Sequence, residues 1–184
     1  GDGNSRGRGS DRETGARSVH LNPAIMIRVF RIFKSRYLNN SFDGEGSRLF
    51  GGRWNSRGRK LIYTAGTLSL AALEILVGIQ DDELLNDYLW LSAEFDERLI
   101  LDIRDLFELP ETWNSSPPSF ETSRIGDNWN DQKTSAVLRV PSVTIPSEVN
   151  YLINPEHPDF TKLAIGKPQK FEFDFRLIKN KLVK

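Results

Sequence analysis

The amino-acid sequence predicts an α+β fold built as one compact domain. Its 184 residues match the usual size of a single domain. Hydrophobic residues make up 38% of the chain, enough apolar surface to offset the conformational entropy lost when one domain folds. Segments typical of strands and of short helices follow one another in irregular order, without repeating βαβ units or internal repeats.

The first 25 residues are predicted to lie outside this domain. They are rich in Gly, Ser and Arg, contain almost no periodic apolar residues, and lead to Met26, the only methionine. This composition is typical of a disordered segment, either a translated leader or a remnant of cloning. The domain is therefore expected to span residues 26–184. Its first strand is predicted at residues 27–33, where β-branched and aromatic residues surround Arg31.

Residues 39–60 combine five glycines with several arginines, which predicts a long loop without a helix or strand. Long loops within compact domains often carry function. Gly51 and Gly52 would let the backbone approach a ligand closely, and Arg53 could bind phosphate oxygens through two parallel hydrogen bonds. A solvent-exposed loop arginine is the alternative interpretation.

A strand at residues 61–64 is predicted to lead into a buried helix at residues 70–77, capped by Thr67 or Ser69. Glu74 is the only charged residue of this stretch and lies among apolar helix residues. A buried carboxylate is costly unless it is paired or faces a cleft. Glu74 therefore lies either on a narrow exposed stripe of the helix or in a functional site.

Further strands are predicted from residue 87 onward. Two are expected within residues 87–103, and another at residues 135–141, where proline ends it. Residues 109–127 read as a Pro, Ser and Thr rich connection that Trp113 and Trp129 hold against the domain. The last strand is predicted from the alternating Phe171, Phe173 and Phe175.

Charge is distributed unevenly although the net charge is zero. Residues 26–60 carry nine Lys and Arg against two acids, whereas residues 79–111 carry eleven acids against two Arg. These segments form either two solvated faces or a cationic substrate cleft with an acidic outer surface. The neutral total weakens nucleic-acid binding, for which the basic side chains near Trp54 and Tyr63 would be candidates.

Several classes of protein lack their motifs in this sequence. Neither the phosphate-binding loop of kinases nor the dinucleotide-binding G-x-G-x-x-G pattern is present, and there is no G-x-S-x-G elbow of a serine hydrolase. The absence of cysteine excludes disulfides, thiolate metal ligands and a cysteine nucleophile. His20 and His157 are far apart, so no metal site is predicted. No apolar run approaches the ~20 residues that cross a bilayer, and we expect a soluble, cytoplasmic protein.

Five short motifs together resemble the RES domain family. They occur in the order and with the spacing typical of that family and cover nearly everything after Met26. In sequence order they are GGRWN at 51–55, YTA at 63–65, SLAALE at 69–74, RVPS at 139–142 and NYLINP at 150–155.

The resemblance implies a bacterial toxin whose mixed sheet is similar to that of ADP-ribosyltransferase toxins. It implies NAD as substrate without a metal, an antitoxin partner of the Xre type, and contact with DNA only through that antitoxin. Its site residues would be Arg31, Arg53, Tyr63 and Glu74. The family's serine corresponds to Ser135 or Ser142, and Ser135 is preferred because it follows a threonine at a strand start, as in ADP-ribosyltransferases.

These residues suggest a mechanism for breaking the bond between nicotinamide and ribose. Glu74 would stabilise positive charge that develops on the sugar. Arg31 and Arg53 would neutralise the pyrophosphate or fix the carboxamide, Tyr63 would stack on the nicotinamide ring, and Ser135 would donate an orienting hydrogen bond. Water, phosphate or a protein side chain could be the acceptor. The other class of function is a catalytically inactive module that only binds the antitoxin.

Overall fold

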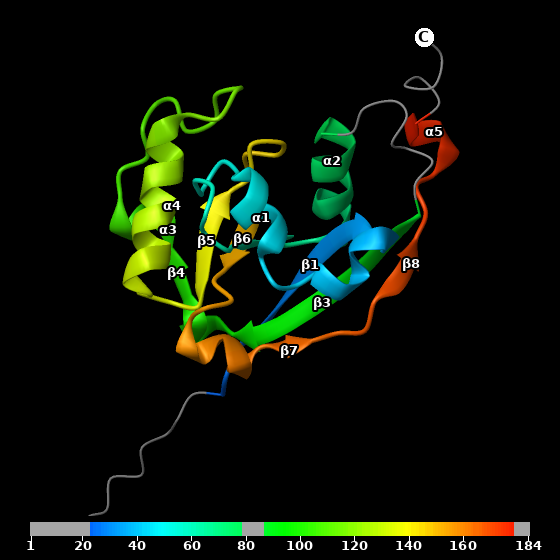
Figure 1. Ribbon diagram of the computed structural model, residues 1–184, viewed down its shortest axis with the longest axis horizontal. Helices are drawn as coiled ribbons and strands as arrows, with labels where there is room; N and C mark the ends of the chain where they lie inside the picture. Colours follow the sequence, from blue (N-terminus) through cyan, green and yellow to red (C-terminus); the bar gives the residue numbers. More distant parts are fainter. Residues whose placement is uncertain (1–22, 79–86, 179–184) are drawn as a thin grey trace, which may run out of the picture.

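A mixed sheet of eight strands is the framework of the protein in the part that the computed structural model describes, residues 23–78 and 87–178 (Figure 1). The strand order is β4-β5-β6-β2-β1-β3-β7, and β8 also pairs with β3. Only β4 and β5 are parallel among these pairs. The strands are β1 (Met26–Lys34), β2 (Ile62–Ala65), β3 (Tyr88–Asp96), β4 (Ile100–Asp102), β5 (Val137–Pro141), β6 (Val149–Ile153), β7 (Ala164–Ile165) and β8 (Gln169–Phe171).

Short helices connect the strands. In Figure 1, α1 and α2 lie on the same side of β1 and β3, while α3 and α4 lie at the β4 end of the sheet. The α-helices are α1 (Glu45–Phe50), α2 (Leu68–Gly78), α3 (Ile103–Leu106), α4 (Phe120–Gln132) and α5 (Phe175–Ile178). The 3-10 helices are η1 (Ser35–Asn40), η3 (Glu97–Leu99) and η4 (Pro158–Lys162). None of the helices in the described ranges is long and apolar enough to span a membrane.

Strand β1 lies near the centre of the sheet, with β2 on one side and β3 on the other. It pairs with β3 over its whole length, from Met26 opposite Asp96 to Lys34 opposite Tyr88. Its side chains alternate between the two faces, as in any strand, so Arg31 points away from its buried neighbour Ile32. Strand β1 therefore places a cationic side chain, Arg31, in the middle of the sheet.

Helix α4 packs against the turn that carries Arg53. Trp129 is 1% exposed and belongs to a hydrophobic cluster that also contains Trp54 and Leu138. A Cβ atom added to Gly126 would lie 1.8 Å from the backbone oxygen of Trp54, so only glycine permits this approach. The position of the turn therefore depends on the packing of α4.

The α+β fold class is confirmed, as are the strands predicted at residues 27–33, 61–64 and 135–141 and the two within 87–103. The helix predicted at residues 70–77 is α2, and the amide of Leu70 donates to Thr67 Oγ1 at 3.0 Å, which makes Thr67 a capping residue. The helix is less buried than predicted, because only Leu70 and Ala71 are buried and Val77 is 71% exposed.

Three predictions were wrong. Residues 39–60 contain α1 and the end of η1, because Gly44 and Gly51 flank the helix instead of interrupting it. The predicted connection at residues 109–127 ends in helix α4, which Ser119 caps by accepting from the Glu121 amide at 3.1 Å. The final strand, β8, ends at Phe171, and Phe175 instead begins α5.

The predicted N-terminal segment, residues 1–25, lies outside the described residues except for its last three. Of these, Ile25 accepts a hydrogen bond from the amide of Glu97 at 2.9 Å. The acidic stretch at residues 79–111 is described from Asp87 onward.

Candidate active site

Arg31 is a partly buried cation that is held by neutral groups. Its Nε donates to the carbonyl oxygen of Ser41 and its Nη1 to that of Tyr63, both at 2.8 Å. None of the described carboxylates forms an ion pair with it. Burial lowers the pKa of Arg31 to about 10, and the charge of Asp43 partly opposes this shift. Arg31 remains protonated at neutral pH, so the site holds a positive charge that forms no ion pair with a described carboxylate.

Glu74 projects from α2 into a set of three hydrogen-bond donors. Its Oε1 accepts from Ser142 Oγ and from Asn150 Nδ2, both at 2.8 Å, and its Oε2 accepts from Thr144 Oγ1 at 2.9 Å. The Ser142 oxygen itself accepts from the amides of Thr144 and Ile145 at 3.1 Å. These two contacts leave the Ser142 hydroxyl proton for Glu74. The carboxylate is thus fixed in orientation by the β5–β6 hairpin.

The structure brings Ser142 to Glu74 and places Ser135 elsewhere. Ser135 Oγ accepts from Trp129 Nε1 at 2.9 Å and donates to the carbonyl of Val137 at 2.8 Å. The two serines lie at opposite ends of β5, roughly 20 Å apart along an extended chain. Ser135 therefore joins α4 to β5, and the preference for it over Ser142 as the orienting serine finds no support in the geometry.

Tyr63 is fixed by its hydroxyl group and offers its ring to the site. The hydroxyl donates to Asn55 Oδ1 at 2.7 Å and accepts from the amide of Trp54 at 3.1 Å. Burial raises the pKa of Tyr63, so the phenol stays neutral. A Cβ atom on Gly52 would lie 2.5 Å from this hydroxyl, which explains the glycine at that position. Because both hydrogen-bonding functions of the hydroxyl are used, the aromatic ring is what remains for a ligand.

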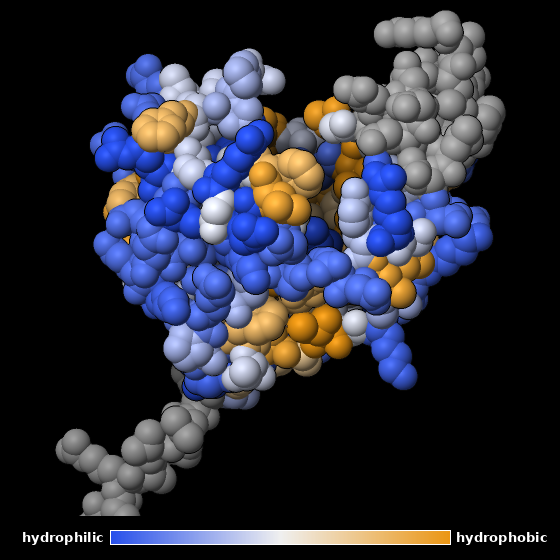
Figure 2. Space-filling model, viewed as in Figure 1, coloured by the Kyte–Doolittle hydropathy of each residue, from blue (hydrophilic) through white to orange (hydrophobic). Residues whose placement is uncertain are grey.

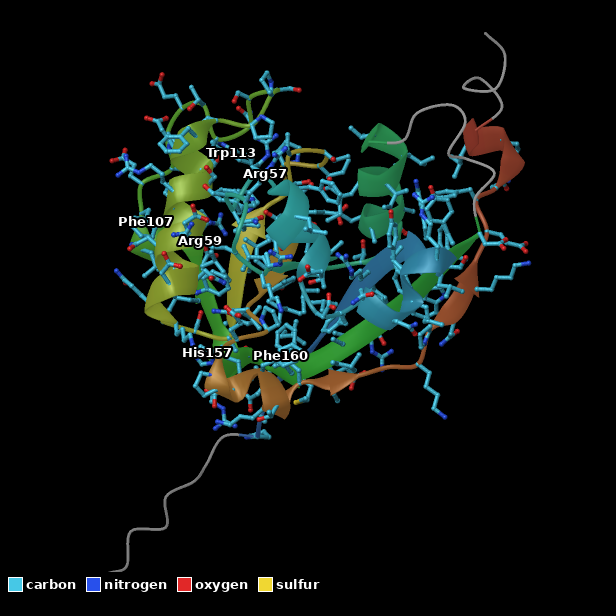
Figure 3. All side chains as sticks on the ribbon, in the orientation of Figure 1. Arg57, Arg59, Phe107, Trp113, His157 and Phe160 are labelled. Atoms are coloured by element: carbon cyan, nitrogen blue, oxygen red, sulfur yellow. The ribbon has the colours of Figure 1, made fainter. Side chains whose placement is uncertain are left out.

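Arg53 holds the loop that precedes α4. Its Nη1 donates to the carbonyl oxygens of Trp113 at 2.8 Å and of Ser115 at 2.9 Å. Burial lowers the pKa of Arg53, while the negative charge of Glu74 opposes the shift. Figure 3 shows Trp113 next to α4, on the same side of the molecule as Arg57. The guanidinium thus links this loop to the site that contains Glu74.

Three adjoining pockets meet at Tyr63, and we refer to them together as the site cleft. The first, of about 190 Å³, is lined by Arg31, Glu74 and Asn150 among others. The second, of about 270 Å³, shares Glu74 and Asn150 and adds Arg53. The third, of about 650 Å³, shares Arg31 and extends under α1. Figure 2 shows an apolar group over α1 within a mostly hydrophilic face.

The cleft thus gathers four of the five predicted site residues, namely Arg31, Arg53, Tyr63 and Glu74. It adds Thr144 and Asn150, which the sequence analysis did not single out. Asn150 opens the quoted NYLINP motif, whereas Thr144 lies in no motif. His157, the histidine of the described ranges, lies by η4, away from α1 and α2 (Figure 3).

Comparisons with known proteins agree on one family. The family model of the RES domain matches residues 28–175. A protein named "Toxin Res" from Photorhabdus laumondii is 42% identical over 154 residues, which cover 83% of this chain and 98% of that protein. A "Prs ADP-ribosylating toxin" from Sphingobium is 35% identical over 145 residues, covering 78% of this chain and 90% of the relative.

A solved structure shares the fold. The M. tuberculosis MbcT–MbcA toxin–antitoxin complex contains a chain that matches with a TM-score of 0.66 at 16% sequence identity. The match covers 88% of this chain and 91% of that chain. At this identity the likeness concerns the fold, which is an α+β domain in both proteins.

Proposed function

This chain belongs to the RES domain family, and from that premise we propose that it is a toxin that consumes NAD by cleaving the bond between nicotinamide and ribose. One observation supports the proposal most directly. Arg31, a cation without a carboxylate partner among the described residues, shares one small pocket with Glu74, a carboxylate fixed by three donors. A dinucleotide presents the complementary pair of features, an anionic pyrophosphate and a sugar that becomes positively charged.

Arg31 is suited to the anionic part of the substrate. A buried charge is unfavourable until a counterion or strong hydrogen bonds compensate it. The two carbonyl oxygens of Ser41 and Tyr63 compensate only part of the guanidinium. A phosphate oxygen bound to its remaining N–H groups would supply the missing charge.

Glu74 is suited to the reacting sugar. Cleavage at the nicotinamide–ribose bond develops oxocarbenium character on the ribose, which a fixed carboxylate stabilises without having to reorient. The Oε1 atom of Glu74 accepts two hydrogen bonds and its Oε2 atom accepts one. A carboxylate offers about four acceptor positions, so Oε2 keeps room for a ribose hydroxyl.

Tyr63 and Arg53 complete the proposed site. Tyr63 lines all three pockets, and its hydroxyl is already used, so we expect its ring to stack on the cationic nicotinamide ring. Arg53 would bind the substrate through the N–H groups that are not bound to the loop carbonyls. The assembled set of groups favours an enzyme over an inactive module that only binds a partner.

Two small molecules could accept the ADP-ribosyl group. Water as acceptor gives hydrolysis of NAD, and phosphate gives phosphorolysis. The second candidate function is mono-ADP-ribosylation of a protein, which the name of the Sphingobium relative favours. The test is incubation of the purified protein with NAD, with and without phosphate and a cell extract, followed by identification of the products. Free ADP-ribose, its phosphate or a modified protein names the acceptor. Intact NAD in every mixture would contradict the proposal.

We also propose an antitoxin of the Xre type as partner in the cytoplasm, with DNA bound only through that antitoxin. The solved toxin–antitoxin complex with the same fold supports a partner of this kind. A protein that depletes NAD would harm its own cell unless a partner held it inactive. Copurification of the chain with the protein encoded beside it tests this part of the proposal.

A further inference from the structure

Asn150 carries a buried oxygen atom that has no hydrogen-bond partner. Its Oδ1 is the single buried side-chain polar atom without a partner among the described residues. Leaving a buried acceptor unsatisfied costs about 1–3 kcal/mol in general, so native proteins contain few such atoms, and those that occur call for an explanation. Asn150 lines both pockets that contain Glu74, so this buried amide belongs to the wall of the site cleft.

The orientation of the amide follows from its neighbour. Glu74 Oε1 is a carboxylate oxygen and accepts hydrogen bonds, so the Asn150 atom that faces it at 2.8 Å is the donor Nδ2. The amide oxygen consequently points elsewhere and needs a donor. Flipping the amide would satisfy neither group, because two acceptors would then face each other.

We propose that Asn150 is a specificity-determining residue whose Oδ1 accepts a hydrogen bond from the nicotinamide riboside half of the substrate. This inference rests on the proposed function. Two groups of that half are donors: the N–H of the carboxamide and the hydroxyl groups of the ribose. The carboxamide lies on one side of the bond that is cleaved and the ribose hydroxyls lie on the other. Asn150 donates a hydrogen bond to the carboxylate assigned to that bond. A substrate that satisfies Oδ1 is thereby aligned with Glu74.

The inference predicts discrimination against substrates that lack the donor. A site built to bind an N–H or O–H rejects an analogue without it, because the buried acceptor then stays unpaired. The 3-acetylpyridine analogue of NAD replaces the carboxamide nitrogen by a methyl group and so removes that donor. The analogue with a 2′-deoxyribose on the nicotinamide side removes a hydroxyl donor. These two analogues separate the two sources.

The experiment compares kcat/KM for NAD and both analogues in the wild type, in Asn150→Ala and in Thr144→Val. We expect the wild type to prefer NAD over one analogue by about 10-fold or more, and Asn150→Ala to bring that ratio close to one. Thr144→Val is the matched control, because it removes a different hydrogen bond to the same carboxylate. It should slow all three substrates by a similar factor and preserve the ratio.

The outcomes distinguish this inference from the proposed function. If the wild type consumes NAD but Asn150→Ala leaves both ratios unchanged, the amide oxygen does not contact the substrate and the inference is wrong. A wild type that treats NAD and both analogues alike leads to the same conclusion without any variant. If the wild type consumes no NAD, the proposed function fails and the inference fails with it. Circular dichroism and melting temperature establish that the variants are folded.

Discussion

At Glu74 the carboxylate accepts hydrogen bonds from three side chains, and an amide could occupy the same place with little rearrangement. In Glu74→Gln the amide oxygen would still accept from Ser142 and Asn150. The amide nitrogen would donate to Thr144, whose hydroxyl can turn to accept. The negative charge near the ribose would be lost.

We therefore expect Glu74→Gln to keep its melting temperature within a few degrees of the wild type and to lower NAD consumption by about 100-fold or more. The measurement is loss of NAD over time at equal protein concentration, together with thermal unfolding. Consumption of NAD at the wild-type rate by a folded Glu74→Gln protein would remove Glu74 from the mechanism.

The two serines around β5 separate a role in the site from a role in the fold. Ser142→Ala removes a donor to Glu74 and should lower NAD consumption about 10-fold or more while changing stability modestly. Ser135→Ala removes the partner of the buried Trp129 nitrogen and should cost about 1–2 kcal/mol of unfolding free energy without a comparable loss of activity. Denaturant titration and NAD assays on both variants give the comparison. The reverse pattern would restore Ser135 as the orienting serine.

The sequence predicts most of the site but not how it is held. The family resemblance pointed to Arg31, Arg53 and Glu74 together, and in the structure they line one cleft. Thr144 could not be found in this way, because it reaches Glu74 across 70 positions through the connection between β5 and β6. A side chain in such a connection has no periodicity or spacing that marks it, and only the paired strands bring it into contact.

At the scale of elements, two of the helices that the sequence analysis missed, α1 and α4, were missed for different reasons. Gly44 and Gly51 adopt positive φ angles of 75° and 72° on either side of α1, where glycine delimits a helix and does not break it. Helix α4 buries small and polar residues such as Thr122, Ser123 and Asp127. It therefore lacks the apolar periodicity by which a packed helix is recognised.

The packing of α4 yields a prediction about the site turn. In Gly126→Ala the new methyl group would overlap the backbone oxygen of Trp54, which has no side-chain freedom to move away. We expect a loss of about 1–3 kcal/mol in unfolding free energy and weaker NAD use, since Trp54 adjoins Arg53. Gly46→Ala is the matched control for stability, because its added Cβ meets nothing within 4 Å. Equal stability of the two variants would show that the turn does not depend on this contact.

Across the whole molecule, ion pairs neutralise much of the uneven charge seen in the sequence. Within the basic stretch at residues 26–60, Arg48 pairs with Glu45 and Arg59 pairs with Asp131 at 2.7 Å. Arg28 pairs with Glu94 from the acidic stretch. Arg31 and Arg53, in contrast, donate to backbone carbonyls. The sequence therefore overstated the separation of charge, and two of the arginines without an ion pair to a described carboxylate, Arg31 and Arg53, line the site cleft.

This concentration of charge suggests how the proposed antitoxin acts. A cleft with Arg31 and Arg53 attracts a carboxylate-bearing segment as readily as it attracts a dinucleotide. We expect such a segment of the antitoxin to occupy the cleft, so that NAD and antitoxin exclude each other. The alternative is binding at the acidic stretch, residues 79–111, with an effect on the cleft from a distance.

Competition binding decides between these two modes. Occlusion of the cleft requires NAD to displace the antitoxin in titrations of the purified complex, and Arg53→Ala should weaken the binding of both ligands. Arg28→Ala is the matched control, because it removes an arginine that is paired with Glu94 and lines none of the three pockets. It should leave both affinities within about 2-fold of the wild type. A stable ternary complex with NAD would rule out occlusion, as would an antitoxin affinity that Arg53→Ala leaves unchanged. Either result would direct attention to the acidic stretch, where charge reversal at Asp105, an exposed residue of α3, should then weaken the antitoxin selectively.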